Sequence, residues 1–177
     1  MRADGIAPGV RTTCMWPADG EAVEMTRNAA VREVIEILEL EAHPLEGGFF
    51  RETFRDPHST AIYYLLTPDT FSEMHRLPGT EVFHHYLGDP VSMLQIDATG
   101  RGRRLRLGRA LAAGMRPQAV VPGGAWQGSR LEPGGQLALL GCTMAPGFDY
   151  ADYVSGEREA LLALCPDFAD EIGALTR

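Results

Sequence analysis

The first periodic pattern along the chain is helical. Apolar residues recur every three or four positions, at Val31, Val34, Ile35 and Leu38. This spacing places them on one face of a helix, which we expect over residues 29–40 with Asn28 as its N-terminal cap. The His43-Pro44 and Gly47-Gly48 pairs then end the helical pattern.

From Phe49 onward the pattern changes to short apolar or alternating runs separated by Gly, Pro and Asp. These runs cover residues 49–54, 61–66, 81–87, 91–97, 118–121 and 136–143. Many short strands with turn residues between them predict an all-β barrel or jelly roll. A second helix is expected over residues 157–164, with a short helical turn near 168–175. We expect one domain over residues 25–177, preceded by a loose arm over residues 1–24, where periodicity is weak.

Length and charge narrow the classes of partner. The chain has 177 residues, about one domain, and a formal net charge of −8. With this charge we expect no nucleic-acid partner. No apolar run approaches the roughly 18 residues needed to cross a bilayer, and residues 1–24 lack the apolar centre of a secretory signal. We therefore predict a cytoplasmic protein without membrane contact.

The basic residues and the cysteines add little chemistry. All 16 basic residues are Arg, which excludes a Lys Schiff base or a Lys general base. Five of them are close together in the sequence, at Arg101, Arg103, Arg104, Arg106 and Arg109. They form either a docking site for an anionic partner or, as the simpler interpretation, a solvated hairpin face. Cys142 lies in an apolar run and is expected to be a buried core residue.

The densest group of chemically active residues lies between Phe71 and Gly88. This stretch holds three of the five histidines, together with Glu81. A strand is expected to end before the Pro78-Gly79 turn, and a second strand to begin at Glu81. The stretch is therefore predicted to bring together side chains from both sides of the turn.

Alternation along the second strand decides which of these side chains share the barrel interior. Glu81, Phe83 and His85 should lie on one face, with His84 on the other face as a structural histidine. His75 precedes the turn and can face Glu81 across it. We therefore expect His75, Glu81 and His85 to meet inside the barrel as candidate catalytic residues.

Two segments resemble the cupin sequence motifs. The first motif reads H-x-H-x(3,4)-E-x(6)-G, and His75, Glu81 and Gly88 match its first His, its Glu and its Gly. The second motif reads P-x-G-x-x-H and is similar to residues 122–127. Further blocks narrow the resemblance to the cupin-5 domain family: EGGFFRET, STAIYYLL, the His75-Arg76 pair, VVPGGAWQ and APGFDYADY. These blocks occur in order over residues 28–177, so the resemblance covers most of the chain.

The resemblance implies a double-stranded β-helix, the cupin jelly-roll barrel, and it implies a homodimer. The helical patterns add an N-terminal helix and short C-terminal helices to this barrel. The resemblance implies no particular reaction, because cupins include dioxygenases, isomerases, epimerases, lyases and plain binding proteins, and a fold does not determine a function.

The chain departs from the metal-binding cupins at two ligand positions. Those proteins use two His and a Glu from the first motif and a His from the second. Here Leu77 fills the second His position and Gln127 the last, so only His75 and Glu81 stand at ligand positions as good donors. We therefore expect no cofactor. The alternative is a divalent metal held by His75, Glu81, Gln127 and His85.

Seven side chains are predicted to line the substrate pocket: Arg51, Thr53, Tyr63, Phe83, Met93, Gln127 and Ser129. Arg51 would pair with a carboxylate or phosphate of the ligand, or else with a carboxylate of the protein. Tyr63 would donate a proton or belong to the core. Phe83 and His85 stand where related sequences carry Trp and another aromatic residue, which indicates a pocket adapted to a different ligand.

We hypothesise a metal-independent acid–base enzyme in which His75 or His85 is the base and Glu81 orients the imidazole. Removal of a proton next to a carbonyl would epimerise, tautomerise, cyclise or dehydrate a small molecule, such as a modified sugar or a biosynthetic intermediate. A non-catalytic binding protein with the same pocket is the first alternative. A metal-dependent cupin enzyme is the second.

Overall fold

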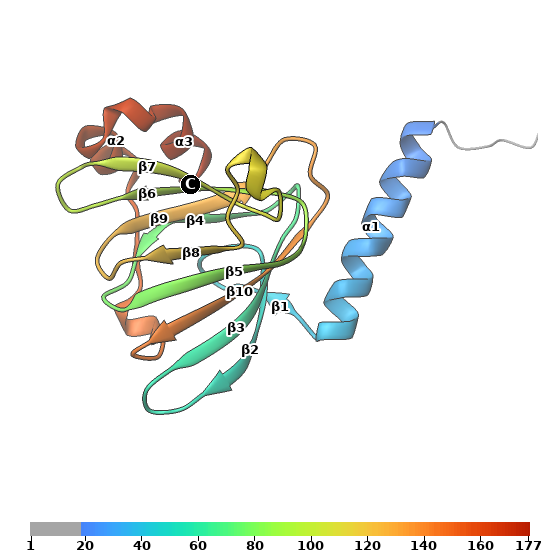
Figure 1. Ribbon diagram of the computed structural model, residues 1–177, viewed down its shortest axis with the longest axis horizontal. Helices are drawn as coiled ribbons and strands as arrows, with labels where there is room; N and C mark the ends of the chain where they lie inside the picture. The colour runs from blue at the N-terminus through green and yellow to red at the C-terminus, as the bar shows by residue number, and fades with distance from the viewer. Residues whose placement is uncertain (1–18) are drawn as a thin grey trace, which may run out of the picture.

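The computed structural model describes residues 19–177, with side chains from residue 29 onward. The predicted all-β barrel is confirmed: two antiparallel sheets face each other (Figure 1). The six-stranded sheet has the order β1 (Glu41–Ala42), β2 (Phe49–Arg55), β3 (Thr60–Leu66), β10 (Ala138–Ala145), β5 (Thr80–Gly88) and β8 (Gln118–Val121). The five-stranded sheet has the order β11 (Val154–Ser155), β4 (Phe71–Arg76), β9 (Trp126–Leu131), β6 (Val91–Ile96) and β7 (Gly102–Leu107).

Apolar side chains from both sheets fill the barrel interior. Those from the six-stranded sheet include Tyr64, Leu66, Phe83 and Leu140. Those from the five-stranded sheet include Val91, Met93, Leu107 and Leu131. Burial of one face of each strand accounts for the alternation seen in the sequence, because successive side chains point to opposite sides of a sheet.

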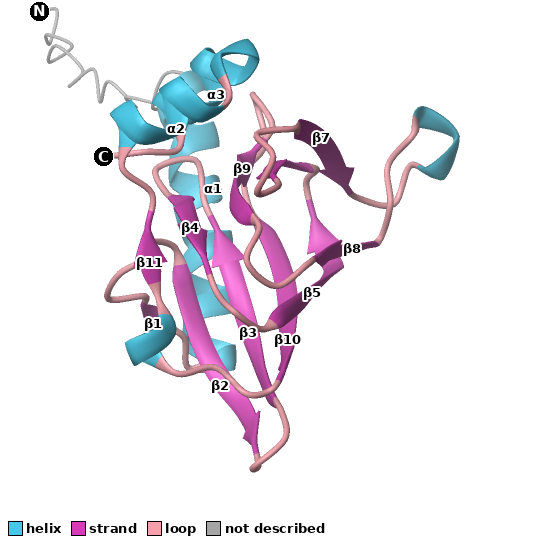
Figure 2. Ribbon diagram, turned by 90° about the vertical axis from the view of Figure 1, so that its left-hand side faces the viewer, coloured by secondary structure: helices cyan, strands magenta, loops and turns pink. Residues whose placement is uncertain are grey.

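The N-terminal helix α1 (Asp19–Leu38) covers part of the outer face of the six-stranded sheet (Figure 2). Its apolar face packs against Leu65 and Leu139, as the helical spacing predicts. The helix begins earlier than expected, so Asn28 lies inside it rather than at its start. Of the predicted arm, residues 19–24 are helical and residues 1–18 lie outside the described residues.

The C-terminal helices α2 (Arg158–Leu164) and α3 (Ala169–Ala174) cover the outer face of the five-stranded sheet. Both lie close to the predicted ranges. Leu161 and Ile172 pack there against Met74 and Leu94, and Trp126 joins this cluster outside the barrel. Short 3-10 turns occur at η1 (Leu111–Ala113), η2 (Tyr150–Asp152) and η3 (Pro166–Phe168).

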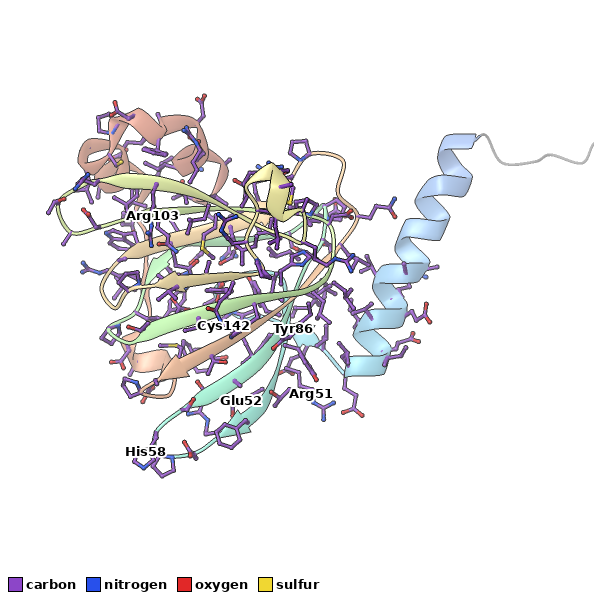
Figure 3. All side chains as sticks on the ribbon, viewed as in Figure 1. Arg51, Glu52, His58, Tyr86, Arg103 and Cys142 are labelled. Carbon is purple, nitrogen blue, oxygen red and sulfur yellow. The ribbon has the colours of Figure 1, made fainter. Side chains whose placement is uncertain are left out.

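The arginine-rich run forms β7 and its flanks, which is the predicted hairpin face. Arg103 (Figure 3) donates to Gln95 Oε1 from Nε at 2.9 Å and from Nη2 at 2.6 Å. Arg104 pairs with Glu171. Because these guanidinium groups have partners within the protein, the run gives no support to an anion-docking site.

Two turns that precede the site residues are in direct contact. Gly124 N donates to Leu77 O at 2.7 Å. At Gly123, a Cβ atom would collide with the carbonyl oxygen of Pro78. This close approach holds the start of β5 next to the start of β9.

Within residues 19–177, no helix is both long enough and apolar enough to cross a membrane.

Candidate functional site

A cavity of about 310 Å³ lies on the inner face of the six-stranded sheet. Its walls come from β2, β3, β5 and β10, two of which carry the labelled residues Glu52 and Cys142 in Figure 3. The apolar part of the lining includes Phe50, Ile62, Leu77, Phe83, Cys142, Met144 and Phe148. The volume is at the lower end of the range of roughly 300–1,000 Å³ that is usual for small-molecule sites.

Strand β5 presents its residues as alternation predicts. Glu81, Phe83 and His85 point inward, whereas His84 lies on the outer face. Glu81 and Phe83 line the cavity and are only 4% and 2% exposed. Phe83 thus lies in the wall of the cavity, where the sequence predicts it.

His85 is buried but lies away from the cavity, which corrects its assignment as a catalytic residue. It is four residues along β5 from Glu81, about 13 Å at the usual strand rise. Its Nε2 is 2.9 Å from the carbonyl oxygen of Asp89, and its Nδ1 has no partner among the described residues. The alternation gave the correct face of the strand, but the cavity opens only at the other end of β5.

His75 on β4 is fully buried and uses both ring nitrogens inside the protein. Nδ1 is 2.7 Å from the carbonyl oxygen of Glu73, which can only accept, so Nδ1 carries the proton. Nε2 therefore accepts from the Gln127 amide at 2.8 Å. The ring stacks on Tyr153 with 4.9 Å between centroids. His75 is not part of the cavity wall, so its expected contact with the ligand is not supported.

Gln127 connects the imidazole to the carboxylate. Its Nε2 lies 2.8 Å from His75 Nε2 and 3.4 Å from Glu81 Oε2. The strand register explains the contact, because Gln127 on β9 lies opposite His75 on β4. His75 and Glu81 therefore lie on either side of one amide in the interior, and no direct contact joins them. Gln127 itself lies behind the cavity wall.

Glu81 is a carboxyl group in the cavity wall whose pKa is shifted toward neutrality. Burial raises its pKa to about 7, and the nearby Glu46 acts in the same direction. The neighbouring His75 and the hydrogen bonds from Gln127 and Cys142 oppose this shift. At neutral pH both the acid and the carboxylate are therefore populated.

Cys142 behaves as the predicted core residue. Its thiol lies 3.8 Å from Glu81 Oε1, and burial, together with the nearby carboxylates, raises its pKa well above the ordinary value. The thiol stays protonated and is no nucleophile.

Two residues in the cavity wall, His43 and Glu46, were not anticipated from the sequence. His43 Nδ1 accepts from Glu46 N at 2.9 Å, and its Nε2 lies 4.0 Å from Glu46 Oε2. Burial lowers the pKa of His43, although Glu46 opposes the shift. Glu46 also accepts from Ser72 Oγ. Both residues lie in the loop before β2, where no periodicity points to a site; the only signal is that Glu46 opens the EGGFFRET block.

Three residues predicted to bind substrate lie outside the barrel. Arg51 Nη1 pairs with Glu39 Oε2 at 2.6 Å, next to the end of α1 (Figure 3). Thr53 Oγ1 donates to the carbonyl oxygen of Ala61 at 3.1 Å. Tyr63 contacts Tyr86 on the outer face, and is therefore neither a pocket acid nor part of the interior core. These predictions are wrong because β2 and β3 turn their neighbouring residues, such as Phe50 and Ile62, to the cavity.

The remaining predicted binding residues, Met93 and Ser129, are neighbours inside the barrel. They are opposite each other in the register of β6 and β9, and both are fully buried. Neither lines the cavity. Ser129 Oγ has no hydrogen-bond partner among the described residues. We therefore find no support for direct contact between these two residues and a ligand.

One segment after β10 serves two parts of the site. Tyr150 lies at the cavity wall, and Tyr153, which follows it closely, stacks on His75. Tyr153 Oη also donates to Glu73 Oε1 at 3.1 Å. The other oxygen of Glu73 pairs with Arg177 Nη1 at 2.9 Å.

The donor set does not fit the metal of the metal-binding cupins. Leu77 supplies a hydrocarbon side chain to the cavity wall, and the Nε2 atom of His75 is occupied by the Gln127 amide. Among the described residues, no three His, Cys, Asp or Glu side chains gather in a way that could hold a metal ion. The four-residue set that includes His85 is not assembled, because His85 lies far along β5.

Comparisons with known proteins agree with this geometry. Residues 32–155 match the family described as Cupin_5, Cupin superfamily (DUF985). The uncharacterized protein YML079W of Saccharomyces cerevisiae is 28% identical over 157 residues, which cover 73% of this chain and 78% of that protein. The crystal structure of protein SO0799 from Shewanella oneidensis has 37% identity and a TM-score of 0.76, and the match covers 82% of this chain and 96% of that one.

More distant structures show the reach of the fold. A hypothetical protein from Leishmania major has 30% identity and a TM-score of 0.75, over 82% of this chain and 97% of that one. Oxalate decarboxylase from Bacillus subtilis has only 16% identity and a TM-score of 0.53, over 77% of this chain and 37% of that one, so it shares the fold alone. Together with the family match over most of its length, these likenesses show that the chain belongs to the cupin superfamily, in the Cupin_5 family.

Proposed function

We propose that the protein is a metal-independent enzyme of the isomerase, epimerase or lyase type, and that Glu81 moves a proton on a small molecule in the cavity. The observation that carries the proposal is the position of Glu81. It is a buried carboxyl group in the wall of a largely apolar cavity, with a pKa raised to about 7. A general acid or base is most effective when its pKa is close to the working pH.

The reaction class follows from the groups around Glu81. A carboxylate at the wall of a cavity with a largely apolar lining suits removal of a proton next to a carbonyl, which leads to epimerisation, tautomerisation, cyclisation or dehydration. The apolar wall, including Leu77 and Phe83, limits the access of water. A modified sugar or a biosynthetic intermediate is the class of substrate that we propose.

His75 and Gln127 act as positioning residues in this proposal. The Gln127 amide donates to both His75 Nε2 and Glu81 Oε2, so it fixes the orientation of the carboxylate. His75, held by the Glu73 carbonyl, fixes the orientation of the amide in turn. The hypothesis from the sequence assigned the role of base to an imidazole. In the present proposal the carboxylate of Glu81 is the base instead.

His43 is the second proton carrier that we propose. It lines the same cavity, and its lowered pKa favours the neutral ring at pH 7. A neutral imidazole donates a proton through one nitrogen and accepts through the other, so it can assist where a proton must be returned.

Proton exchange with solvent tests the proposed function. The protein is incubated in D2O with a panel of small carbonyl compounds, and deuterium uptake next to the carbonyl is followed by NMR. Glu81→Gln should slow the uptake at least about 100-fold, since a positioned acid–base group contributes roughly 10²- to 10⁴-fold. Glu36→Gln, on the exposed face of α1, is the matched control and should leave the rate unchanged.

Equal uptake in the wild type and in Glu81→Gln would overturn the acid–base role. A compound that binds in the cavity but exchanges no proton in the wild type would favour the alternative, a non-catalytic binding protein.

The homodimer and the cytoplasmic location stay proposals that rest on the family resemblance and on the sequence. Light scattering of the purified full chain should give twice the mass of 19.3 kDa. A mass of one chain at micromolar concentration would contradict the dimer.

A further inference from the structure

The cavity contains more carboxylates than available cations. Four acids line it: Glu41, Glu46, Glu52 and Glu81. Among residues 29–177, Arg55 is the only Arg in the lining, and it is already engaged by Glu52, with Nε to Oε1 at 2.9 Å and Nη2 to Oε2 at 2.7 Å. Arg55 Nη1 donates to the carbonyl oxygen of Phe148 at 3.0 Å. The Arg that could attract an anionic ligand is thus occupied.

Glu81 in particular has no direct ion-pair partner among the described residues, and His75 lies behind the Gln127 amide. Within residues 29–177, no Arg side chain lies within ion-pair distance of it. Its donors are the Gln127 amide at 3.4 Å and the Cys142 thiol at 3.8 Å, both long contacts. A buried carboxylate without a cation is costly, and a cation that enters the cavity would offset this cost.

Aromatic rings line the same cavity. His43 contacts Phe50 with 4.7 Å between ring centroids and Tyr150 with 6.2 Å. Phe148 meets Tyr150 edge to face at 4.8 Å, and Tyr64 also lies in the wall. The faces of Phe and Tyr rings attract cations when these lie within about 6 Å of the ring centre.

The electrostatic field at Tyr150 has the sign expected for a cation site. Partial burial and the nearby carboxylates of Glu41, Glu52 and Glu46 all raise the pKa of its phenol, and Arg55 opposes them. Negative charge therefore gathers around an aromatic ring that belongs to the cavity wall.

We propose that the cavity binds a small molecule with a positively charged nitrogen, a protonated amine or a quaternary ammonium on an apolar body, in preference to a carboxylate or a phosphate. The inference deepens the proposed function and rests on it, because it takes this cavity as the substrate site. The ammonium group offsets the charge of Glu81 and of the carboxylates near Tyr150. The apolar body contacts side chains such as Ile62 and Met144.

Three probes of one shape and different charge test this proposal: benzylammonium, benzyl alcohol and benzoate. Their binding to the full-length protein is measured by isothermal titration calorimetry at pH 8 and low ionic strength. Benzylammonium should bind about tenfold more tightly than benzyl alcohol, in line with a desolvated cation–π contact and an ion pair. Benzoate should bind more weakly than the alcohol, because it meets the same carboxylates.

The variant Glu41→Gln removes one negative charge from the cavity wall and nearly preserves the shape of the side chain, so it shows whether charge causes the preference for the cation. Glu41 is exposed at the cavity wall and is not part of the proposed acid–base machinery. The variant should weaken benzylammonium binding about threefold and leave benzyl alcohol binding unchanged. Glu36→Gln, which keeps the same net charge as Glu41→Gln but lies outside the cavity, should change neither affinity.

Benzoate binding equal to or tighter than that of benzylammonium would overturn the charge class, as would the absence of binding by all three probes at millimolar concentration. The exchange experiment on Glu81→Gln tests the proposed acid–base function independently of either result. Conversely, the probes could show a clear preference for the cation while proton exchange does not depend on Glu81. This result would overturn the proposed acid–base function and support the proposed class of ligand.

Discussion

At the scale of single residues, burial is the main influence on the chemistry of Glu81. Removing the carboxylate from water favours its protonated form, and this effect outweighs the opposing effects of His75 and of the hydrogen bonds from Gln127 and Cys142. A carboxyl group that is stable as an acid in the folded protein must also affect stability, because protonation and folding are linked.

The first prediction concerns this linkage. The ordinary pKa of Glu81 is 4.5, and its folded value is about 7. Between these values the folded state holds a proton that the unfolded state has lost, so the free energy of unfolding should fall as pH rises through this window. The loss should be about 3 kcal/mol at most above pH 7. Urea unfolding of the wild type and of Glu81→Gln at pH 5 and pH 8 measures it.

Glu81→Gln should lack this contribution, so its stability relative to the wild type should improve between pH 5 and pH 8. Glu36→Gln should follow the wild type at both values. An identical pH dependence in the wild type and Glu81→Gln would show that Glu81 titrates normally.

The sequence predicts which side chains face the barrel interior only where it also shows which of the two alternating sets of residues on a strand is buried. On β5 the alternation from Glu81 to His85 gave the correct face, because the resemblance of this segment to the first cupin motif places Glu81 in the barrel interior and so sets the phase of the strand. On β2 the sequence alone does not show which face is buried. The inward residues are Phe50 and Glu52, and the outward residues are Arg51 and Thr53, so polar residues occur on both faces. How far the cavity extends along a strand is also a tertiary property, which explains the error at His85.

At the scale of elements, most of the longer strands and the C-terminal helices were predictable, whereas the loops and strand β9 (Trp126–Leu131), which is absent from the predicted runs, were not. Strands such as β8, observed at Gln118–Val121, have clear patterns and turn residues at their ends. The two-residue strands β1 and β11 are too short to show any period. His43 and Glu46 belong to the loop after β1, and their place in the site depends on how that loop packs over the barrel.

The second prediction concerns the contact between the two turns before β5 and β9. Gly123→Ala would place a Cβ against the carbonyl oxygen of Pro78, a backbone atom that cannot rotate away. We expect destabilisation by about 1–3 kcal/mol, as is usual for overpacking. Gly173→Ala is the control: it lies in α3 with open space around it, so it should be neutral or slightly stabilising. Urea unfolding measures both, and equal stability of the two variants would contradict the expectation.

At the scale of the whole molecule, helices cover the outer faces of both sheets. The apolar spacing in α1 gave its packing face correctly, but its start was missed, because the residues before Asn28 have weak periodicity. The C-terminal helices pack through Leu161 and Ile172 onto the sheet that carries His75 and Gln127. They therefore belong to the framework that supports the site.

The third prediction tests the packing of this outer layer. Leu161 is 1% exposed, so Leu161→Ala should destabilise the protein by about 2–5 kcal/mol. Leu164→Ala, at a position that is 38% exposed in the same helix, should cost less than about 1 kcal/mol. Thermal and urea unfolding followed by circular dichroism compare the two. Similar losses in both variants would mean that the helices are not anchored through Leu161.

The segment that follows β10 has a mechanical consequence. A single 3-10 turn joins Tyr150, at the cavity wall, to Tyr153, whose ring lies flat on His75. Tyr150 and Tyr153 thus lie at the two ends of one short turn. We therefore expect a ligand that displaces Tyr150 to disturb the ring that stacks on His75 as well, because both tyrosines are held by the same turn.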